Sequence, residues 1–224
     1  MKTSTKLFTV LILIVILTSS CAIKKYVLNP DYYSSDSKLG VILVTNEIGI
    51  LQSGSRGALD ILLTQGKKYK EPLDAVDSSV NPNNKFEKLH MGLLKSKGKN
   101  ATIVAKEFDE SEFEKFIKPD KSKTYFSKDI RSLKNKYQVD ELMIASIGYG
   151  LNINYYGMIE TGKGGYSHIV SQIINLSDNS IIYKSESWGN GKLEKKWDEP
   201  PYEALRIAVA SALQQAIEIE KTKY

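Results

Sequence analysis

The sequence contains only one cysteine and two histidines among its 224 residues. One cysteine cannot form a disulfide within the chain, so covalent cross-links do not hold the fold. His90 and His168 lie far apart and have no cysteine partners, which argues against a zinc site. The G-x-S-x-G motif of serine hydrolases is also missing from the sequence, so His168 with its neighbouring serines is the best basis for a hydrolase. We therefore expect a protein that is not an enzyme and that binds no metal ion.

A concentrated basic region is missing as well. The chain has 31 Lys+Arg against 26 Asp+Glu, a formal net charge of +5, and the lysines are scattered along it. Proteins that bind nucleic acid usually gather their positive charge on one face. We expect no nucleic-acid partner, and we interpret the lysines as solvated surface residues.

The first twenty residues differ in composition from the rest of the chain. Two lysines precede an apolar run from Leu7 to Leu17, and three small residues that end at Ser20 follow it. This layout is typical of a secretory signal peptide. The run is about half of the roughly 20 residues that a membrane-spanning helix needs. We predict cleavage between Ser20 and Cys21.

Cys21 follows the small residues directly, and this arrangement resembles a bacterial lipobox. Thr18 stands where the usual pattern has leucine, and Leu17 lies one position earlier. The resemblance implies a diacylglycerol on the Cys21 thiol and an acyl chain on its amine, and we expect no other cofactor. Two or three acyl chains hold a protein stably at a membrane, whereas one binds only marginally. The alternative is an ordinary secreted protein with a free thiol.

The composition after Cys21 divides the chain further. Residues 22–38 are polar and rich in turn-forming residues, with Tyr26, Tyr32 and Tyr33 as candidates for docking onto a domain. The remaining length suits one domain. We therefore expect a signal peptide at 1–20, a lipid anchor and tether at 21–38, and a single mixed α/β domain at 39–224.

The first half of this domain alternates between two periodicities. Short apolar runs predict buried strands at 39–45, 101–105 and 142–149. Between them we predict an irregular insertion at 66–80 and helices that begin at Asn84, Glu112 and Ser127. Asn84 and Glu87 form a candidate capping box, and Gly98 is expected to end that helix. Strands separated by helices predict a parallel sheet with right-handed crossovers.

The second half has a different pattern. Strand-like segments at 151–159, 166–176 and 181–188 are separated by gaps too short for a helix, so we expect antiparallel neighbours. Pro200 and Pro201 then open a long amphipathic helix. The predicted fold class is α/β with α+β character: a mixed sheet with a parallel β-α-β-α-β first half, an antiparallel meander and a C-terminal helix.

The stretch that begins at Gly157, "GMIETGKG", is one residue short of a phosphate-binding loop. Such a loop must lead from a buried strand into a helix whose amides cradle the phosphate. Here the sequence leads into a strand, and Gly164 has no hydroxyl for a metal ion. We predict no nucleotide binding and interpret the stretch as a hairpin turn in which Gly162, Gly164 and Gly165 adopt positive φ.

The segment "INLSDNSIIY" from residue 174 to 183 resembles a motif of envelope lipoproteins, the group that includes CsgG, LpoB and domains similar to the N-terminal domain of TolB. The positions that carry the resemblance are Asn175, Leu176, Asp178, Asn179 and Tyr183. The resemblance implies a TolB-N-like fold, a lipid-anchored position on the periplasmic side of the cell outer membrane, and a role that is not enzymatic. It implies no catalytic residue.

Three functions remain open on this basis. The first is a periplasm-facing binding or scaffold component of a cell-envelope assembly or secretion machine, with an envelope protein or further copies of itself as partners. The second is a CsgG-like outer-membrane channel subunit, which requires strands of about 9–11 residues with alternating hydrophobicity. The third is an envelope hydrolase that uses His168.

Overall fold

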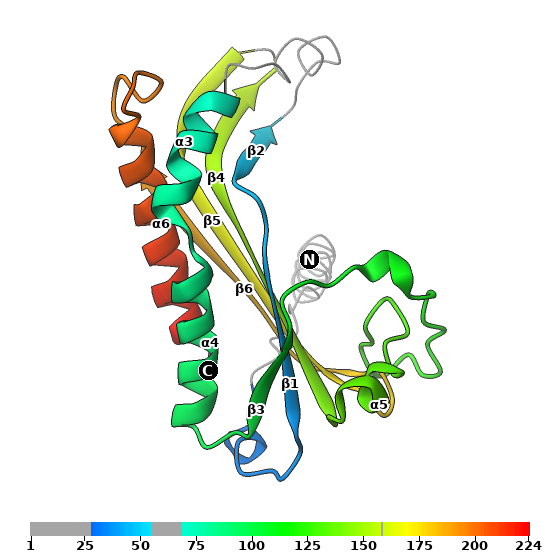
Figure 1. Cartoon of the computed structure of the whole chain (residues 1–224). Helices are drawn as coiled ribbons and strands as arrows, with labels where there is room; N and C mark the ends of the chain where they lie inside the picture. The colour runs from blue at the N-terminus through cyan, green and yellow to red at the C-terminus, as the bar shows by residue number, and fades with distance from the viewer. Residues whose placement is uncertain (1–27, 55–68, 158) are drawn as a thin grey trace, which may run out of the picture.

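The computed structural model describes residues 28–54, 69–157 and 159–224. Within these residues the chain forms a six-stranded sheet in the order β3-β1-β4-β5-β6, with β2 also paired to β4 (Figure 1). The pairs β3–β1 and β1–β4 are parallel, and the pairs β4–β5 and β5–β6 are antiparallel. The predicted fold class is confirmed. The strands are β1 Leu39–Thr45, β2 Gly49–Gly54, β3 Ala101–Ala105, β4 Glu141–Tyr156, β5 Ile159–Asn175 and β6 Ile181–Lys192.

Strand β2 was not expected from the sequence. It follows β1 along the same edge of β4, with Thr45 opposite Ile147 and Gly49 opposite Gly150. The β1–β2 side therefore has one residue more than β4 at this point, as in a β-bulge. Between its two terminal glycines, β2 has only two consecutive apolar residues, Ile50 and Leu51, which is too short a run to indicate a strand.

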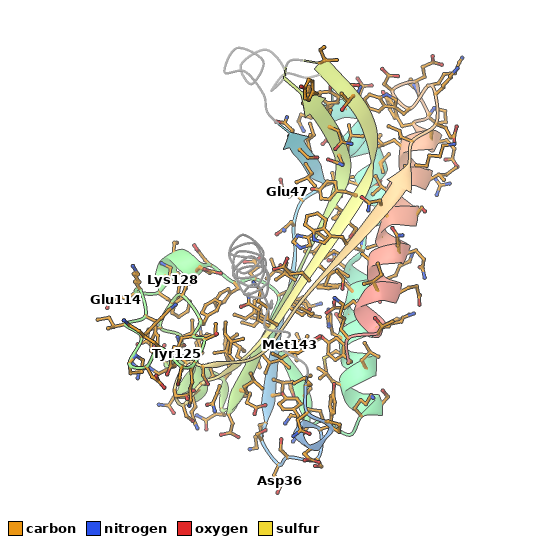
Figure 2. All side chains as sticks on the ribbon, turned by 180° about the vertical axis from the view of Figure 1, so that it is seen from behind. Asp36, Glu47, Glu114, Tyr125, Lys128 and Met143 are labelled. Atoms are coloured by element: carbon orange, nitrogen blue, oxygen red, sulfur yellow. The ribbon has the colours of Figure 1, made fainter. Side chains whose placement is uncertain are left out.

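Three helices cover one face of the sheet, and a fourth lies at the opposite face (Figure 1). Alternate residues of β4, such as Ile147, Leu151 and Ile153, point to the covered face and are fully buried. On the other face a second apolar cluster includes Ile42 and Ile130. A side lobe that contains Glu114, Tyr125 and Lys128 covers it (Figure 2). The helices are α3 Lys70–Val80, α4 Asn83–Ser96, α5 Leu133–Tyr137 and α6 Glu203–Lys221, with 3₁₀ turns η1 Pro30–Tyr32 and η2 Glu110–Glu112.

Helix α6 packs directly onto bare backbone of β5 and β6. A Cβ atom built on Gly189 would lie 1.8 Å from the carbonyl oxygen of Ala212, and one on Gly191 would lie 1.8 Å from that of Ala208. Gly165 faces the same turn of the helix, where a Cβ would lie 2.3 Å from the Ala208 oxygen. These glycines therefore allow a closer approach of the helix to the sheet than any side chain permits.

The same helix also reaches around the outer edge of β6. The Asn190 N–H donates to the Gln215 side-chain oxygen at 2.6 Å, and the Lys223 ammonium donates to the Glu186 carbonyl at 3.0 Å. The Asn190 N–H and the Glu186 carbonyl are backbone groups of β6 on the side away from β5. The edge strand thus has two of its outward backbone groups bound by side chains of α6 and of the residues that follow it.

Several predicted elements are wrong in detail. Residues 70–80 form α3 rather than an irregular insertion, with Leu73, Val76 and Val80 buried at helical spacing. The helix predicted from Glu112 is absent from the described structure. There the backbone runs extended, and the Phe116 N–H donates to the Ser127 carbonyl.

The ends of other elements also differ from the prediction. Helix α5 starts at Leu133, not near Ser127. Helix α4 begins at Asn83 without a side-chain cap, so the capping box of Asn84 is wrong, whereas Gly98 does follow its end with φ +84°. The strand predicted at 151–159 is not separate, because β4 continues unbroken from Glu141 to Tyr156.

Candidate functional site

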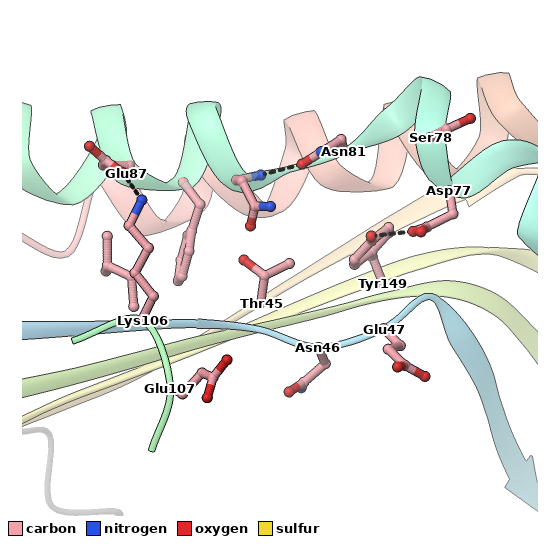
Figure 3. A pocket seen from close by; sticks show the side chains of 13 residues that line it. Thr45, Asn46, Glu47, Asp77, Ser78, Asn81, Glu87, Lys106, Glu107 and Tyr149 are labelled. Atoms are coloured by element: carbon pink, nitrogen blue, oxygen red, sulfur yellow. Dashed lines mark hydrogen bonds and ion pairs between the residues drawn. The ribbon is translucent and has the colours of Figure 1, made fainter. Parts of the chain in front are cut away.

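A polar cleft lies where β1 and β3 end. Its volume is about 420 Å³, within the range of small-ligand sites. The β1–β2 connection provides one wall, α3 and the start of α4 provide another, and the residues after β3 close it (Figure 3). Ligands commonly bind outside the carboxyl ends of parallel strands, because loops from neighbouring strands converge there. The lining residues are Leu43, Thr45, Asn46, Glu47, Asp77, Ser78, Asn81, Asn83, Phe86, Glu87, Lys106, Glu107 and Tyr149.

Hydrogen bonds and an ion pair hold part of this lining in place. The Tyr149 hydroxyl donates to Asp77 at 2.5 Å, and burial together with this carboxylate raises the pKa of Tyr149 (Figure 3). Lys106 lies 3.3 Å from Glu87. A neighbouring hollow of about 440 Å³ shares Asn81, Asn83, Glu87 and Lys106 with the cleft. The lining therefore presents hydroxyl, amide and carboxylate groups in a partly fixed arrangement.

Negative charge predominates in the cleft. Four carboxylates, from Glu47, Asp77, Glu87 and Glu107, stand against the single ammonium of Lys106. Among the described residues, no group of three or more His, Cys, Asp or Glu side chains is placed to hold a metal ion. The arrangement favours a partner that brings amino or guanidinium groups, by charge complementarity.

The two histidines lie in different surroundings. His90 is fully buried on α4, where its Nδ1 lies 2.8 Å from the Tyr224 hydroxyl, and burial lowers its pKa to about 3. His168 lies on β5 and stacks on Trp188 of β6 at a centroid distance of 3.7 Å. Its pKa is lowered by burial, although Glu186 lies 3.8 Å from its Nε2.

The structure does not place His168 with the serines that a hydrolase would need. The neighbouring Ser167 points to the opposite face of the sheet, where its hydroxyl donates to the Gly148 carbonyl. Ser171 lies on that opposite face too and donates to Glu220. Residues 167 and 168 diverge because successive side chains of a strand alternate between its two faces.

The glycine-rich stretch from Gly157 is a strand rather than the predicted turn. The chain reverses at Gly157, which has φ +61°, and β5 already begins at Ile159. Positive φ at Gly162, Gly164 and Gly165 is therefore wrong. Gly165 meets the backbone of α6 instead, so its lack of a side chain serves packing.

The residues that carry the resemblance to envelope lipoproteins lie in and beside the connection from β5 to β6. The Asn175 side chain accepts the Ser177 N–H at 2.8 Å, and Asp178 accepts the Ser180 N–H at 3.0 Å. Asn179 is fully buried with φ +64°. Its amide donates to the carbonyls of residues 126 and 128 and its oxygen accepts the N–H of residue 130, which ties the side lobe to the sheet.

Two further motif residues are core residues. Leu176 is buried in the second apolar cluster with 1% exposure. Tyr183 is buried on the other face, beside Tyr224. The motif positions therefore serve the fold, and none of them lines the cleft.

The lipid-anchor residues lie outside the described part of the chain. Ser20 and Cys21 belong to this undescribed segment, as does Tyr26 of the predicted tether. Tyr32 and Tyr33 are described and pack against the main core. Across residues 28–54, 69–157 and 159–224, none of the helices is both long and apolar enough to cross a membrane.

Two buried polar clusters were not anticipated from the sequence. Glu220 of α6 is fully buried and accepts hydrogen bonds from the hydroxyls of Ser171, Ser185 and Ser187. Lys99, between α4 and β3, is buried against Glu141. In the sequence, Ser185 and Ser187 alternate with charged residues, which predicts that both serines lie on the same face of β6. This pattern was the only sign of the first cluster that the sequence offered.

No family model matches the chain, and no curated protein matches it. Solved structures give weak likenesses. The hypothetical protein CT253 from Chlamydia trachomatis is 7% identical, with 82% of this chain and 95% of that chain covered and a TM-score of 0.36. Lipoprotein GNA1162 from Neisseria meningitidis is 8% identical, with 70% and 86% covered and a TM-score of 0.18. At these scores neither likeness supports an argument about function.

Proposed function

We propose that the chain is a lipid-anchored, periplasm-facing lipoprotein that acts as a binding or scaffold component of a cell-envelope assembly. The observation that carries this proposal is a sequence typical of a signal peptide at residues 1–20, followed directly by Cys21, the single cysteine of the sequence. Leu28, seven residues after Cys21, is already buried against the domain. A domain so close to its acyl chains stays beside the membrane surface.

The cleft is the part of this domain best suited to hold a partner. It combines a defined cavity, fixed polar groups and an excess of carboxylates. His90 forms a hydrogen bond with the Tyr224 hydroxyl, and His168 stacks on the Trp188 ring. Neither histidine is placed beside a serine that it could activate as a nucleophile. The proposal is therefore a role in binding rather than in catalysis, with an envelope protein or a second copy of this chain as partner.

The lipid anchor is tested by metabolic labelling with a fatty-acid probe. We expect the wild-type chain to incorporate the probe and to fractionate with the outer membrane, and Cys21→Ser to do neither. An unlabelled wild-type chain, or an unmodified thiol found by mass spectrometry of the mature product, contradicts the proposal.

The binding role is tested with a photo-cross-linking amino acid in the cleft. Placed at Glu107, it should capture a protein partner or a second copy in intact envelopes. Ser211 is the matched control position, because it is exposed on α6 away from the cleft. Capture of the same products from both positions, or of none from Glu107, counts against the cleft as the binding site.

A further inference from the structure

The chain from residue 28 to residue 38, here called the strap, is docked onto the domain. Leu28 is buried with 7% exposure. The N–H groups of Asp140 and Glu141 donate to the Lys38 carbonyl at 2.9 and 3.1 Å, and the Lys38 N–H donates to the Asp140 carboxylate at 3.1 Å. The strap therefore lies at the end of the sheet where β1 and β4 begin (Figure 1).

A buried lysine fastens the strap. The Lys99 side chain has no exposed surface, and its ammonium lies 3.5 Å from the Glu141 carboxylate. It donates to the hydroxyls of Ser35 and Ser37 at 2.6 and 2.7 Å and lies 4.1 Å from the centre of the Tyr32 ring. The Tyr32 hydroxyl donates to the same Glu141 carboxylate at 2.8 Å.

This arrangement makes release of the strap unfavourable. Most polar partners of the Lys99 ammonium come from the strap, and the remaining one comes from β4. Release of the strap removes these hydrogen-bond acceptors from a buried ammonium, and leaving a buried charged donor without its acceptors costs free energy. The docked strap is thus packed onto the folded domain, and Tyr32 and Tyr33, two of the expected docking residues, contact its core.

The length of chain before the strap limits where the membrane can be. The backbone from Cys21 to Leu28 spans at most about 25 Å, even when fully extended. Strand β4 runs for 16 residues from Glu141, beside the strap, to Tyr156 at the other end of the sheet. At about 3.3 Å per residue its far end lies roughly 50 Å away. Figure 2 shows Asp36 of the strap at one extremity of the molecule.

We infer that the strap end of the domain is its membrane-facing surface, and that the occupant of this surface is the bilayer that holds the acyl chains of Cys21. This inference rests on the proposed lipid anchor. Charges of both signs lie at this end: the strap carries Asp31, Asp36 and Lys38, and the Lys97 ammonium lies 5.7 Å from the centre of the Tyr33 ring. Because the charges at this end are mixed, the orientation is set by the short segment from Cys21 to Leu28 and by the docked strap. Added salt should therefore not change the orientation.

The orientation is tested with the full-length, processed protein in vesicles of phosphatidylethanolamine and phosphatidylglycerol. Because the sequence has one cysteine, which carries the lipid, an introduced cysteine is the only free thiol for a fluorescent label. Asp36→Cys reports on the strap end and Thr161→Cys on the hairpin end, and both positions are exposed. Energy transfer to an acceptor on the lipid headgroups should be several-fold stronger from position 36. Equal transfer from both positions, or stronger transfer from position 161, overturns the inference.

The role of the strap is tested with Lys99→Met, which keeps the side-chain length and removes the charge. We expect the difference in energy transfer between the two labelled positions to shrink. Once the strap is released, the flexible segment that follows Cys21 extends to residue 38. Lys95→Met is the matched control, since Lys95 is exposed on the last turn of α4, four residues before Lys99, and it should leave the difference unchanged. A folded Lys99→Met variant with an unchanged difference contradicts the fastening role.

Two further measurements keep the outcomes distinct. If Lys99→Met does not fold, the double variant Ser35→Ala/Ser37→Ala weakens the strap without leaving Glu141 unpaired, and it should reduce the difference as well. Incorporation of the fatty-acid probe is measured on the same samples. Loss of probe from the wild-type chain refutes the proposed anchor, whereas full labelling with equal energy transfer refutes the orientation alone.

Discussion

The contact between α6 and the sheet gives the sharpest prediction about stability. Gly189→Ala adds one methyl group to β6, directly under the helix. Its carbon would lie 1.8 Å from the Ala212 carbonyl oxygen, 2.7 Å from the Ala216 nitrogen and 2.8 Å from the Ala212 carbonyl carbon. Side-chain Cβ atoms essentially never approach other atoms closer than 3.0 Å, so the helix has to move by about the difference, 3.0 − 1.8 = 1.2 Å.

The size of the effect follows from what that movement disturbs. Leu205, Val209 and Leu213 of α6 are fully buried against the sheet, and moving the helix opens space around each of them. Overpacking of a core, including the backbone shifts that it forces, costs about 1–3 kcal/mol and in some cases more. Since the clashing atoms here are backbone atoms of a long helix, we expect a loss of about 3 kcal/mol or more in the free energy of unfolding.

The assay is urea unfolding of the mature chain, followed by far-ultraviolet circular dichroism. Gly92→Ala is the matched control, because Gly92 lies in α4 and no atom lies within 4 Å of the place that an added methyl group would take. The same substitution should stabilise the protein there, by up to about 1 kcal/mol, through helix propensity. A Gly189→Ala variant that unfolds at the wild-type urea concentration refutes the close packing described above.

Three further predictions use the same measurement. Ser187→Ala should cost about 1–2 kcal/mol, because it removes a hydroxyl that donates to buried Glu220 at 2.7 Å, whereas exposed Ser96→Ala should have almost no effect. Asn179→Gly preserves the left-handed backbone but leaves two carbonyls and one N–H of the side lobe without their partner, so we expect a loss of about 2–3 kcal/mol. The folded pKa of His90 is about 3 and its unfolded value is 6.5, so the stability that it contributes is complete above pH 6.5 and is lost as the pH falls toward 3. Between pH 7 and pH 5 this amounts to about 2 kcal/mol. His90→Phe should reduce the difference in stability between these two pH values by that amount, and an unchanged difference contradicts the assignment.

The elements predicted correctly are those whose signal is local. The apolar runs at 39–45 and 101–105 and the long amphipathic helix at the C-terminus carry their own periodicity, so the mixed sheet follows from sequence. Strand β2 depends on pairing with β4 rather than on its own composition. Helix α3 was not predicted because Pro72 and several polar residues suggest a loop. Its buried residues nevertheless have helical spacing.

The glycine-rich segment was misjudged for a different reason. Glycine is equally suited to a turn and to close packing of two backbones, and a sequence alone does not distinguish these uses. Only the position of α6 over Gly165 decides between them. The cleft was missed because its lining comes from three separate connections, and the partners of Lys99 and Glu220 lie far away in the chain.

The side chains that bind the outer border of β6 bear on how copies of this protein meet one another. Under the proposed lipid anchor, copies of the protein meet one another in two dimensions, where an open strand border is a template for one chain to join the next. Gln215 and Lys223 already bind backbone groups along that border. Neighbouring copies are thereby hindered from pairing through β6 into a continuous sheet.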